Sequence, residues 1–359
     1  MNAVMTVDLS ELDAWSAQVQ RASDDLSGIA RNGGNALVQT DFGPILETMM
    51  GAYNALLPSI HQSLEDNGTG MHDHAEALKA TARDFTLTED GVVRRHNAQG
   101  VDGRDGSSQF FDVADTTIRR AGPTETSLPQ ISFGFPYDTV CDLVRMLTGF
   151  DIRAELAEKI GGDVVSASSQ GSSFGALGQS MAGVASNLQS GSQTISQTWQ
   201  GGASDAAIAQ IGTWVGSLST QAGQLVQMGQ NVVQICKDAW QTALAVVQCV
   251  KSAVQTVSSA LATMSIPGVG WARVVQAVWQ AFQAVMKAYK AIMKLISILK
   301  QVSSFIETVK SFFDDDLAPV STPTAPTSTG TPSSITRDPG SITTPTIGQK
   351  PAQATVVPA

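Results

Sequence analysis

The sequence is short of aromatic and of charged residues. Only 6% of its 359 residues are aromatic and 15% are charged. Alanine, glycine, serine, glutamine and valine dominate instead, and such small side chains suit thin helical bundles better than a thick enzyme core. With 42% hydrophobic residues the chain can still bury a core, and its length allows two domains of ordinary size.

Positive charge is scarce as well. The chain has 22 lysines and arginines against 32 acidic residues, a formal net charge of −10. Phosphate binding needs a concentrated basic face, so we expect no nucleic-acid partner. The first residues, MNAVMTVDLSELDAW, also lack the basic start and apolar core of a secretory signal peptide, so export through the general pathway is not expected.

Cysteine is too rare for a disulfide framework. The chain has three, Cys141, Cys236 and Cys249. The last two lie 13 positions apart on one expected helix, about 20 Å by helical rise, and cannot pair with each other. We therefore expect free thiols that are buried.

Residues that carry chemistry are few and badly spaced. A metal site needs three or four converging ligands, whereas His72 and His74, two positions apart on a helix, point to different sides, and His61 is the only other histidine nearby. The sequence shows no recognisable pattern of a catalytic nucleophile with a partner base. We expect no enzyme, no metal and no cofactor; an acid/base or metal site within residues 90–160 would revive the enzyme class.

Helical periodicity is abundant. In residues 1–90 the stripe Leu12, Val19, Leu26 and Ile29 predicts an amphipathic helix, with Ser10 and Asp13 resembling a capping box. The turn TDFGP follows, and Pro44 suits the first position of a second helix. We expect the glycines of EDNGTG to kink or interrupt that helix. This unit is predicted to be a helical hairpin that folds separately.

A second helical unit spans residues 136–316, after an irregular linker at 91–135. Two short helices lead into a seam of apolar residues from Phe174 to Ile195 and then a long helix with apolar residues from Ile211 to Val257. A third helix follows SIPGVGW, with the apolar stripe Val275, Val278, Phe282, Val285, Tyr289, Ile292, Ile296, Leu299 and Ile306. Residues 317–359, rich in Thr, Pro and Ser, are predicted to be a disordered tail. The fold class is therefore all-α, with two helical-hairpin modules.

One stretch of this second unit is almost uncharged. Between Asp163 and Lys237 the only charged residue is Asp205. Surface helices usually carry charge on the solvent side. The polar face of Gln, Ser, Gly and Asn therefore either meets solvent without charge or packs against another part of the molecule.

The turn between the two arms carries Trp199, Gly201 and Gly202. The glycines supply backbone conformations that bulkier residues avoid, and Trp199 can cover the end of the hairpin. With arms of suitable length on either side, this Trp-x-Gly turn resembles the WxG-motif family of type VII (ESX) secretion substrates. Residues 135–265 are similar to the helical N-terminal modules that precede toxin domains in actinobacterial ESX-linked proteins, although the Thr/Pro tail stands where a toxin domain follows there.

Residues 1–90 resemble the EspC-like ESX secretion-associated proteins. Such substrates carry an export signal of Tyr, three residues, then Asp or Glu, and Phe85 and Glu89 have that spacing, with Phe in place of Tyr. The resemblance implies a secreted or envelope-associated protein that binds the type VII machinery and a helical WxG-family partner or a second copy of itself. The bland alternative is that Phe85 is a core residue and Glu89 is solvated.

The third helix is basic. Lys287, Lys290 and Lys294 could meet an anionic membrane surface, or they could be the solvated face of a bundle. A membrane-active or pore-forming secreted protein is therefore the alternative function, and a cytosolic helical scaffold is the second alternative.

Overall fold

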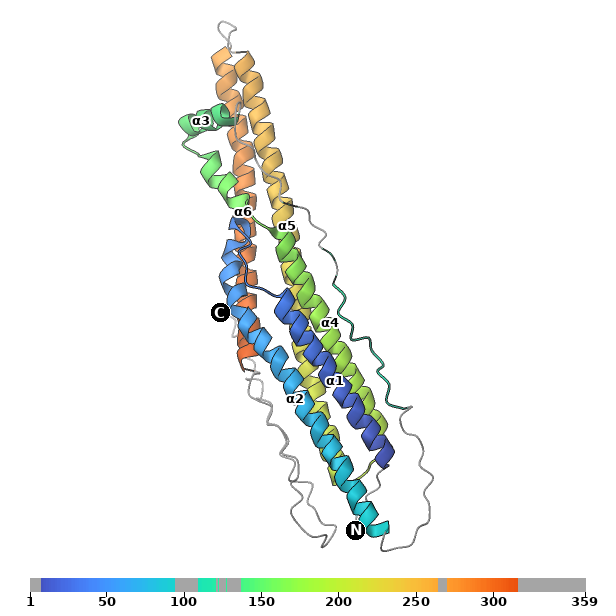
Figure 1. The fold of residues 1–359 in the computed structure, drawn as a ribbon. Helices are drawn as coiled ribbons and strands as arrows, with labels where there is room; N and C mark the ends of the chain where they lie inside the picture. Colours follow the sequence, from blue (N-terminus) through green and yellow to red (C-terminus); the bar gives the residue numbers. More distant parts are fainter. Residues whose placement is uncertain are drawn as a thin grey trace, which may run out of the picture.

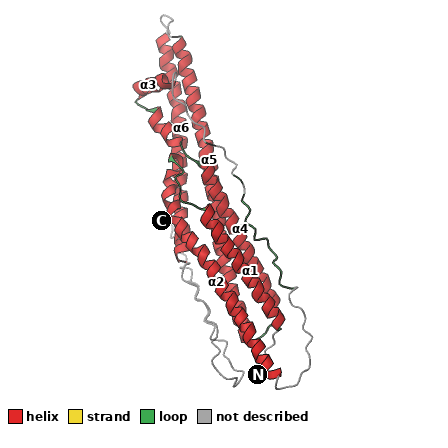
Figure 2. Cartoon of the chain, in the orientation of Figure 1, coloured by secondary structure: helices red, strands yellow, loops and turns green. Residues whose placement is uncertain are grey.

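The computed structural model describes residues 8–93, 109–120, 122, 127, 137–263 and 270–315. Every regular element in these ranges is a helix (Figure 2), which confirms the all-α class. The predicted disordered tail at 317–359 and most of the predicted linker at 91–135 lie outside the described residues.

The first hairpin consists of α1 (Leu9–Ala36) and α2 (Glu47–Val93), joined through the short 3-10 helix η1 (Pro44–Leu46). The predicted stripe of α1 is buried, and Pro44 begins η1 as expected of a helix-starting proline. The capping prediction is wrong. The cap is Asp8, whose carboxylate accepts hydrogen bonds from the backbone N–H groups of Ser10 at 3.0 Å and Glu11 at 3.4 Å.

Helix α2 continues through the EDNGTG segment, so these glycines do not interrupt it. The two glycines of this segment mark close approaches of neighbouring helices. A Cβ on Gly68 would lie 2.9 Å from Ser27 Oγ of α1, and a Cβ on Gly70 would lie 2.8 Å from the Trp214 ring of α5. Packing against α1 and α5 outweighs the low helix propensity of glycine at these positions.

The second unit begins with α3 (Tyr137–Thr148), a π-helical turn η3 (Arg153–Ala157) and a 3-10 turn η4 (Glu158–Ile160). Three long helices follow: α4 (Val164–Ile195), α5 (Gly202–Ala262) and α6 (Gly270–Asp315). The 61 residues of α5 span about 90 Å at the helical rise of 1.5 Å per residue. The molecule is correspondingly elongated. Helices α1, α2 and α4 lie along the first half of α5, and α5 and α6 continue beyond them with α3 alongside (Figure 1).

The N-terminal hairpin does not pack separately from the second unit. Its helix α1 contacts α4, and α2 contacts α6. The hydroxyl of Tyr53 in α2 donates a hydrogen bond to the side chain of Gln170 in α4, and Ser59 in α2 donates to Asp314 in α6. One hydrophobic core includes residues of both units, so the predicted separate packing is wrong. The domain boundaries themselves stay predictions.

The uncharged helix α4 packs on several sides at once. Gln170, Ser173, Ser180 and Asn187 are buried along it together with its apolar seam. Against α5 the two backbones come very close, since a Cβ on Gly178 would lie 2.7 Å from the carbonyl oxygen of Ala222. Of the two explanations offered for this polar stretch, packing therefore holds for α4, because a charged side chain would find no water there.

The three cysteines are free, as expected. Cys141 and Cys236 are buried, whereas Cys249 is half-buried. Burial raises the pKa of the Cys141 thiol, which keeps it protonated and unreactive at neutral pH.

Candidate functional site

The Trp199 turn connects α4 to α5. Helix α4 ends at Ile195, whose carbonyl accepts a hydrogen bond from the Trp199 N–H at 2.9 Å. Gly201 has a φ of 118°, a conformation that favours glycine, and it is the N-cap of α5. Gly202 is already the first residue of α5, so the expected special backbone conformation is found at Gly201 and not at Gly202. No side chain caps α5, and Ser204 Oγ donates to the Trp199 carbonyl at 2.7 Å.

The Trp199 ring lies in an aromatic cluster that unites both hairpins. The ring is 1% exposed. It meets the edge of Trp15 from α1 with ring centroids 6.1 Å apart, and it meets Phe85 from α2 at 6.4 Å. Edge-to-face pairs of this kind add to the apolar burial. We call Trp15, Phe85 and Trp199 the aromatic cluster.

Polar contacts at this end of the bundle also join the two hairpins. Thr198, next to Trp199, donates a hydrogen bond to the buried Glu11 carboxylate of α1. The indole nitrogens of Trp15 and Trp199 are buried and have no hydrogen-bond partner among the described residues. The Trp199 turn is therefore held from the N-terminal hairpin as well as from its own helices.

Trp15, which packs against Trp199, was not among the predicted site residues. The signal was available, because Trp15 follows Leu12 by three positions and precedes Val19 by four, which places it on the same helical stripe. Which ring it meets could not be read from that spacing.

The candidate export signal, Phe85 and Glu89, lies near the end of α2. Both residues belong to the same continuous helix. The Phe85 side chain is half-buried against the Trp199 ring. It therefore contributes to the core, as in the alternative that treats Phe85 as a core residue. That contact does not exclude recognition, because the Phe85 side chain is only partly buried.

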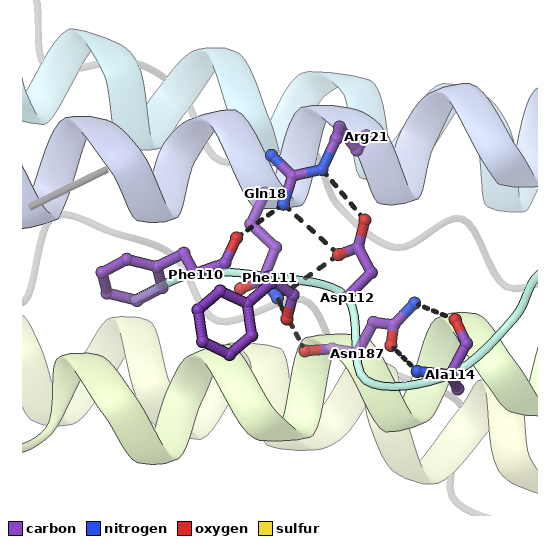
Figure 3. A network of polar contacts seen from close by, with 7 residues as sticks. All are labelled: Gln18, Arg21, Phe110, Phe111, Asp112, Ala114 and Asn187. Carbon is purple, nitrogen blue, oxygen red and sulfur yellow. Dashed lines mark hydrogen bonds and ion pairs between the residues drawn. The ribbon is translucent and has the colours of Figure 1, made fainter. Parts of the chain in front are cut away.

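An extended segment at residues 109–120 runs along α1 and α4 (Figure 3). The Arg21 side chain pairs with Asp112 at 3.0 Å and donates to the Phe110 carbonyl at 2.8 Å. The Asn187 side chain accepts from the Ala114 N–H at 2.7 Å and donates to the Ala114 carbonyl at 3.1 Å. Within residues 109–120 the predicted linker has no helix or strand, and its backbone bonds to side chains of α1 and α4.

The candidate membrane-facing lysines, Lys287, Lys290 and Lys294, are all exposed on α6. None of them forms an ion pair with any residue in the described ranges. Within the same ranges one helix, α5, has the length and apolar composition of a membrane span; its most apolar window has a mean hydropathy of 1.2 and is 33% buried. The core helix of a bundle has the same features, so this window does not decide the question.

His72 and His74 of α2 point to different sides of the helix, as their spacing predicted. His72 is exposed and His74 is buried. Burial lowers the pKa of His74 to about 4, and neither of its ring nitrogens has a partner in the described residues. Over those residues no three His, Cys, Asp or Glu side chains gather in a way that could hold a metal ion.

No protein-family model and no curated protein matches the sequence. Among solved structures, the chain is similar to EspB from the ESX-1 type VII secretion system, with a TM-score of 0.30 and 12% identity, covering 80% of this chain and 92% of that one. Because a TM-score this low does not establish a shared fold, we take no residue role from it.

Proposed function

We propose that the chain is a non-catalytic substrate or secretion-associated protein of a type VII (ESX) system, and that it acts through helical protein–protein contacts. The carrying observation is the contact between Phe85 and Trp199, with ring centroids 6.4 Å apart. These two residues belong to the two sequence features that resemble type VII substrates, and they come from different hairpins. Because the Trp199 ring is buried, it supports Phe85 from below, and the partly buried Phe85 is the ring of this pair that a receptor can contact.

Phe85 and Glu89 serve as the export signal in this proposal. Four residues apart on α2, they share one face of the helix. The missing tyrosine hydroxyl removes one hydrogen bond, worth about 0.5 to 1.5 kcal/mol, and keeps the larger apolar contribution of the ring.

The test is secretion of Glu89→Ala in a host whose type VII system exports the unaltered chain. Glu89 is the better position, because Phe85→Ala would also remove packing on Trp199. We expect Glu89→Ala to accumulate inside the cell with an unchanged thermal unfolding midpoint. Glu76→Ala, an exposed acidic residue of the same helix, is the matched control and should be exported normally.

Phe85→Tyr provides a second test of the export signal, since it restores the hydroxyl of the family signal. Its export should equal or exceed that of the unaltered chain. Normal export of Glu89→Ala would remove Glu89 from the signal, and equal release from a strain without the type VII system would refute the proposed function as a whole.

A further inference from the structure

The first three turns of α6 expose a row of large apolar side chains. Trp271 is 53% exposed, Val275 is 44% exposed and Trp279 is 56% exposed. Their spacing of four residues places them within an arc of about 80° on the helix. We call these three residues the tryptophan row. Val275 was predicted to belong to the apolar stripe, but at this end of α6 the buried face is formed by Val274 and Val278, and Val275 lies outside it.

The rest of this helical flank is covered. Phe282 and Tyr289 lie on it, and the Phe150 ring from the loop after α3 packs against both, with centroids 6.1 and 5.7 Å apart. Among the described residues no ring contact joins Phe150 to the tryptophan row, and Trp279 pairs only with Phe282. Two exposed indoles, eight residues or about two turns apart, are therefore left for a partner outside the described chain.

The neighbouring arc of the helix is basic. Counted from Trp271 at 100° per residue, the lysines 290, 294 and 287 fall at about 100°, 140° and 160°, on the arc next to that of the tryptophan row and about 12 Å or more farther along the helix than Trp279. All three are exposed and unpaired within the described residues. An exposed apolar row followed along the same flank by lysines on the neighbouring arc matches an anionic membrane surface, where apolar acyl chains adjoin negative headgroups.

We propose that the tryptophan row of α6 inserts into the interface of an anionic bilayer, with Lys287, Lys290 and Lys294 held at the headgroups. Tryptophan is favoured at this depth, because its ring is apolar while its N–H can bond to headgroups and water. The charge of the lysine row commits the surface to an anionic bilayer and not to a second copy, since a second copy would bring the same positive charges together. This surface lies at the end of α6 remote from the Trp199 turn, so it is independent of the proposed export site (Figure 1).

The experiment is a binding titration of the full chain with phosphatidylcholine vesicles that contain or lack phosphatidylglycerol. We expect binding to the anionic vesicles, and a loss of about tenfold or more in the double variant W271S/W279S. The triple variant K287Q/K290Q/K294Q should bind both vesicle types equally weakly, because each lysine near such a surface accounts for about a fivefold change. V38S is the matched control: Val38 is also an exposed apolar residue, but it follows α1, and this variant should bind normally.

A second measurement reports insertion directly. Bromine-labelled acyl chains should quench the tryptophan fluorescence of the unaltered chain and not that of W271F/W279F, whose remaining indoles at positions 15, 199, 214 and 240 lie in the bundle. Circular dichroism and urea midpoints near those of the unaltered chain would show that all variants are folded. Undiminished vesicle binding by W271S/W279S would overturn the proposal. So would an absence of binding by the unaltered chain, or a dimer in solution that W271S/W279S dissolves.

Discussion

The indole rings of Trp15 and Trp199 meet edge to face, with centroids 6.1 Å apart and an angle of 67° between their planes. Trp15 lies near the start of α1 and Trp199 in the turn after α4, so the contact ties the N-terminal hairpin to the second one. Because the Trp199 ring is buried, removing it leaves a cavity between the hairpins that neither can fill alone.

Trp199→Ala should therefore lower the free energy of unfolding by about 3 to 5 kcal/mol, measured by urea denaturation. Trp279→Ala is the control of identical chemistry, and at this exposed position the loss should stay below about 1 kcal/mol. Equal losses in the two variants would contradict a cluster that holds the hairpins together.

Glycine positions in α4 offer a matched pair. A Cβ at Gly178 would meet the Ala222 carbonyl oxygen at 2.7 Å and the Val226 nitrogen at 3.0 Å, whereas a Cβ at Gly175 would meet nothing within 4 Å. Gly178→Ala should destabilise the fold by about 1 to 3 kcal/mol through overpacking. Gly175→Ala should stabilise it by up to about 1 kcal/mol through helix propensity. Thermal unfolding compares the two directly, and a gain for Gly178→Ala would show that the α4–α5 spacing can widen freely.

The buried His74 predicts a pH dependence of stability. Its pKa is about 4 in the folded protein and 6.5 as an ordinary histidine. The unfolded chain therefore binds the proton more readily, so the contribution of His74 is fully present above pH 6.5 and is lost as the pH falls from 6.5 towards 4. Between pH 7 and pH 5 this amounts to about 2 kcal/mol.

His74→Leu should remove that part of the pH dependence while keeping the stability at pH 7, because neither ring nitrogen has a partner to lose in the described residues. Urea midpoints at pH 7 and pH 5 for the unaltered chain and the variant give the difference. The exposed His72→Leu should leave the pH dependence as it is. A slope unaffected by His74→Leu would assign the dependence to carboxylates.

The extended segment 109–120 should resist proteolysis as long as Asn187 holds it. Two hydrogen bonds join this buried side chain to the Ala114 backbone, and each is worth about 0.5 to 1.5 kcal/mol. In Asn187→Ala, trypsin should cut after the exposed Arg119 or Arg120 about tenfold faster. Asn32→Ala, which loses only a bond to its own helix, should be cut at the original rate. Equal cleavage of all three proteins would show that the segment is not held there.

Local pattern was enough to determine the helices. The stripe of Leu12, Val19, Leu26 and Ile29 is buried as its period required, and the breaks near Pro44, Gly149 and Trp199 separate elements where turn chemistry placed them. These features depend on residues close in the chain, where the helical period and glycine or proline geometry leave little choice. The separation of His72 from His74 follows from the same period.

Only the tertiary structure decided which faces meet. The glycines of EDNGTG predicted a weakened helix. The residues that pack against them, Ser27 and Trp214, belong to other helices, so the local pattern could not show this packing. Three further features depend on how the long helices stack. They are the pairing of Trp199 with Trp15 and Phe85, the course of residues 109–120 along α1 and α4, and the exposure of Val275. Periodicity shows that a face is apolar, but the free energy of burial is non-directional, so the partner that covers this face, or leaves it open, is set by the whole assembly.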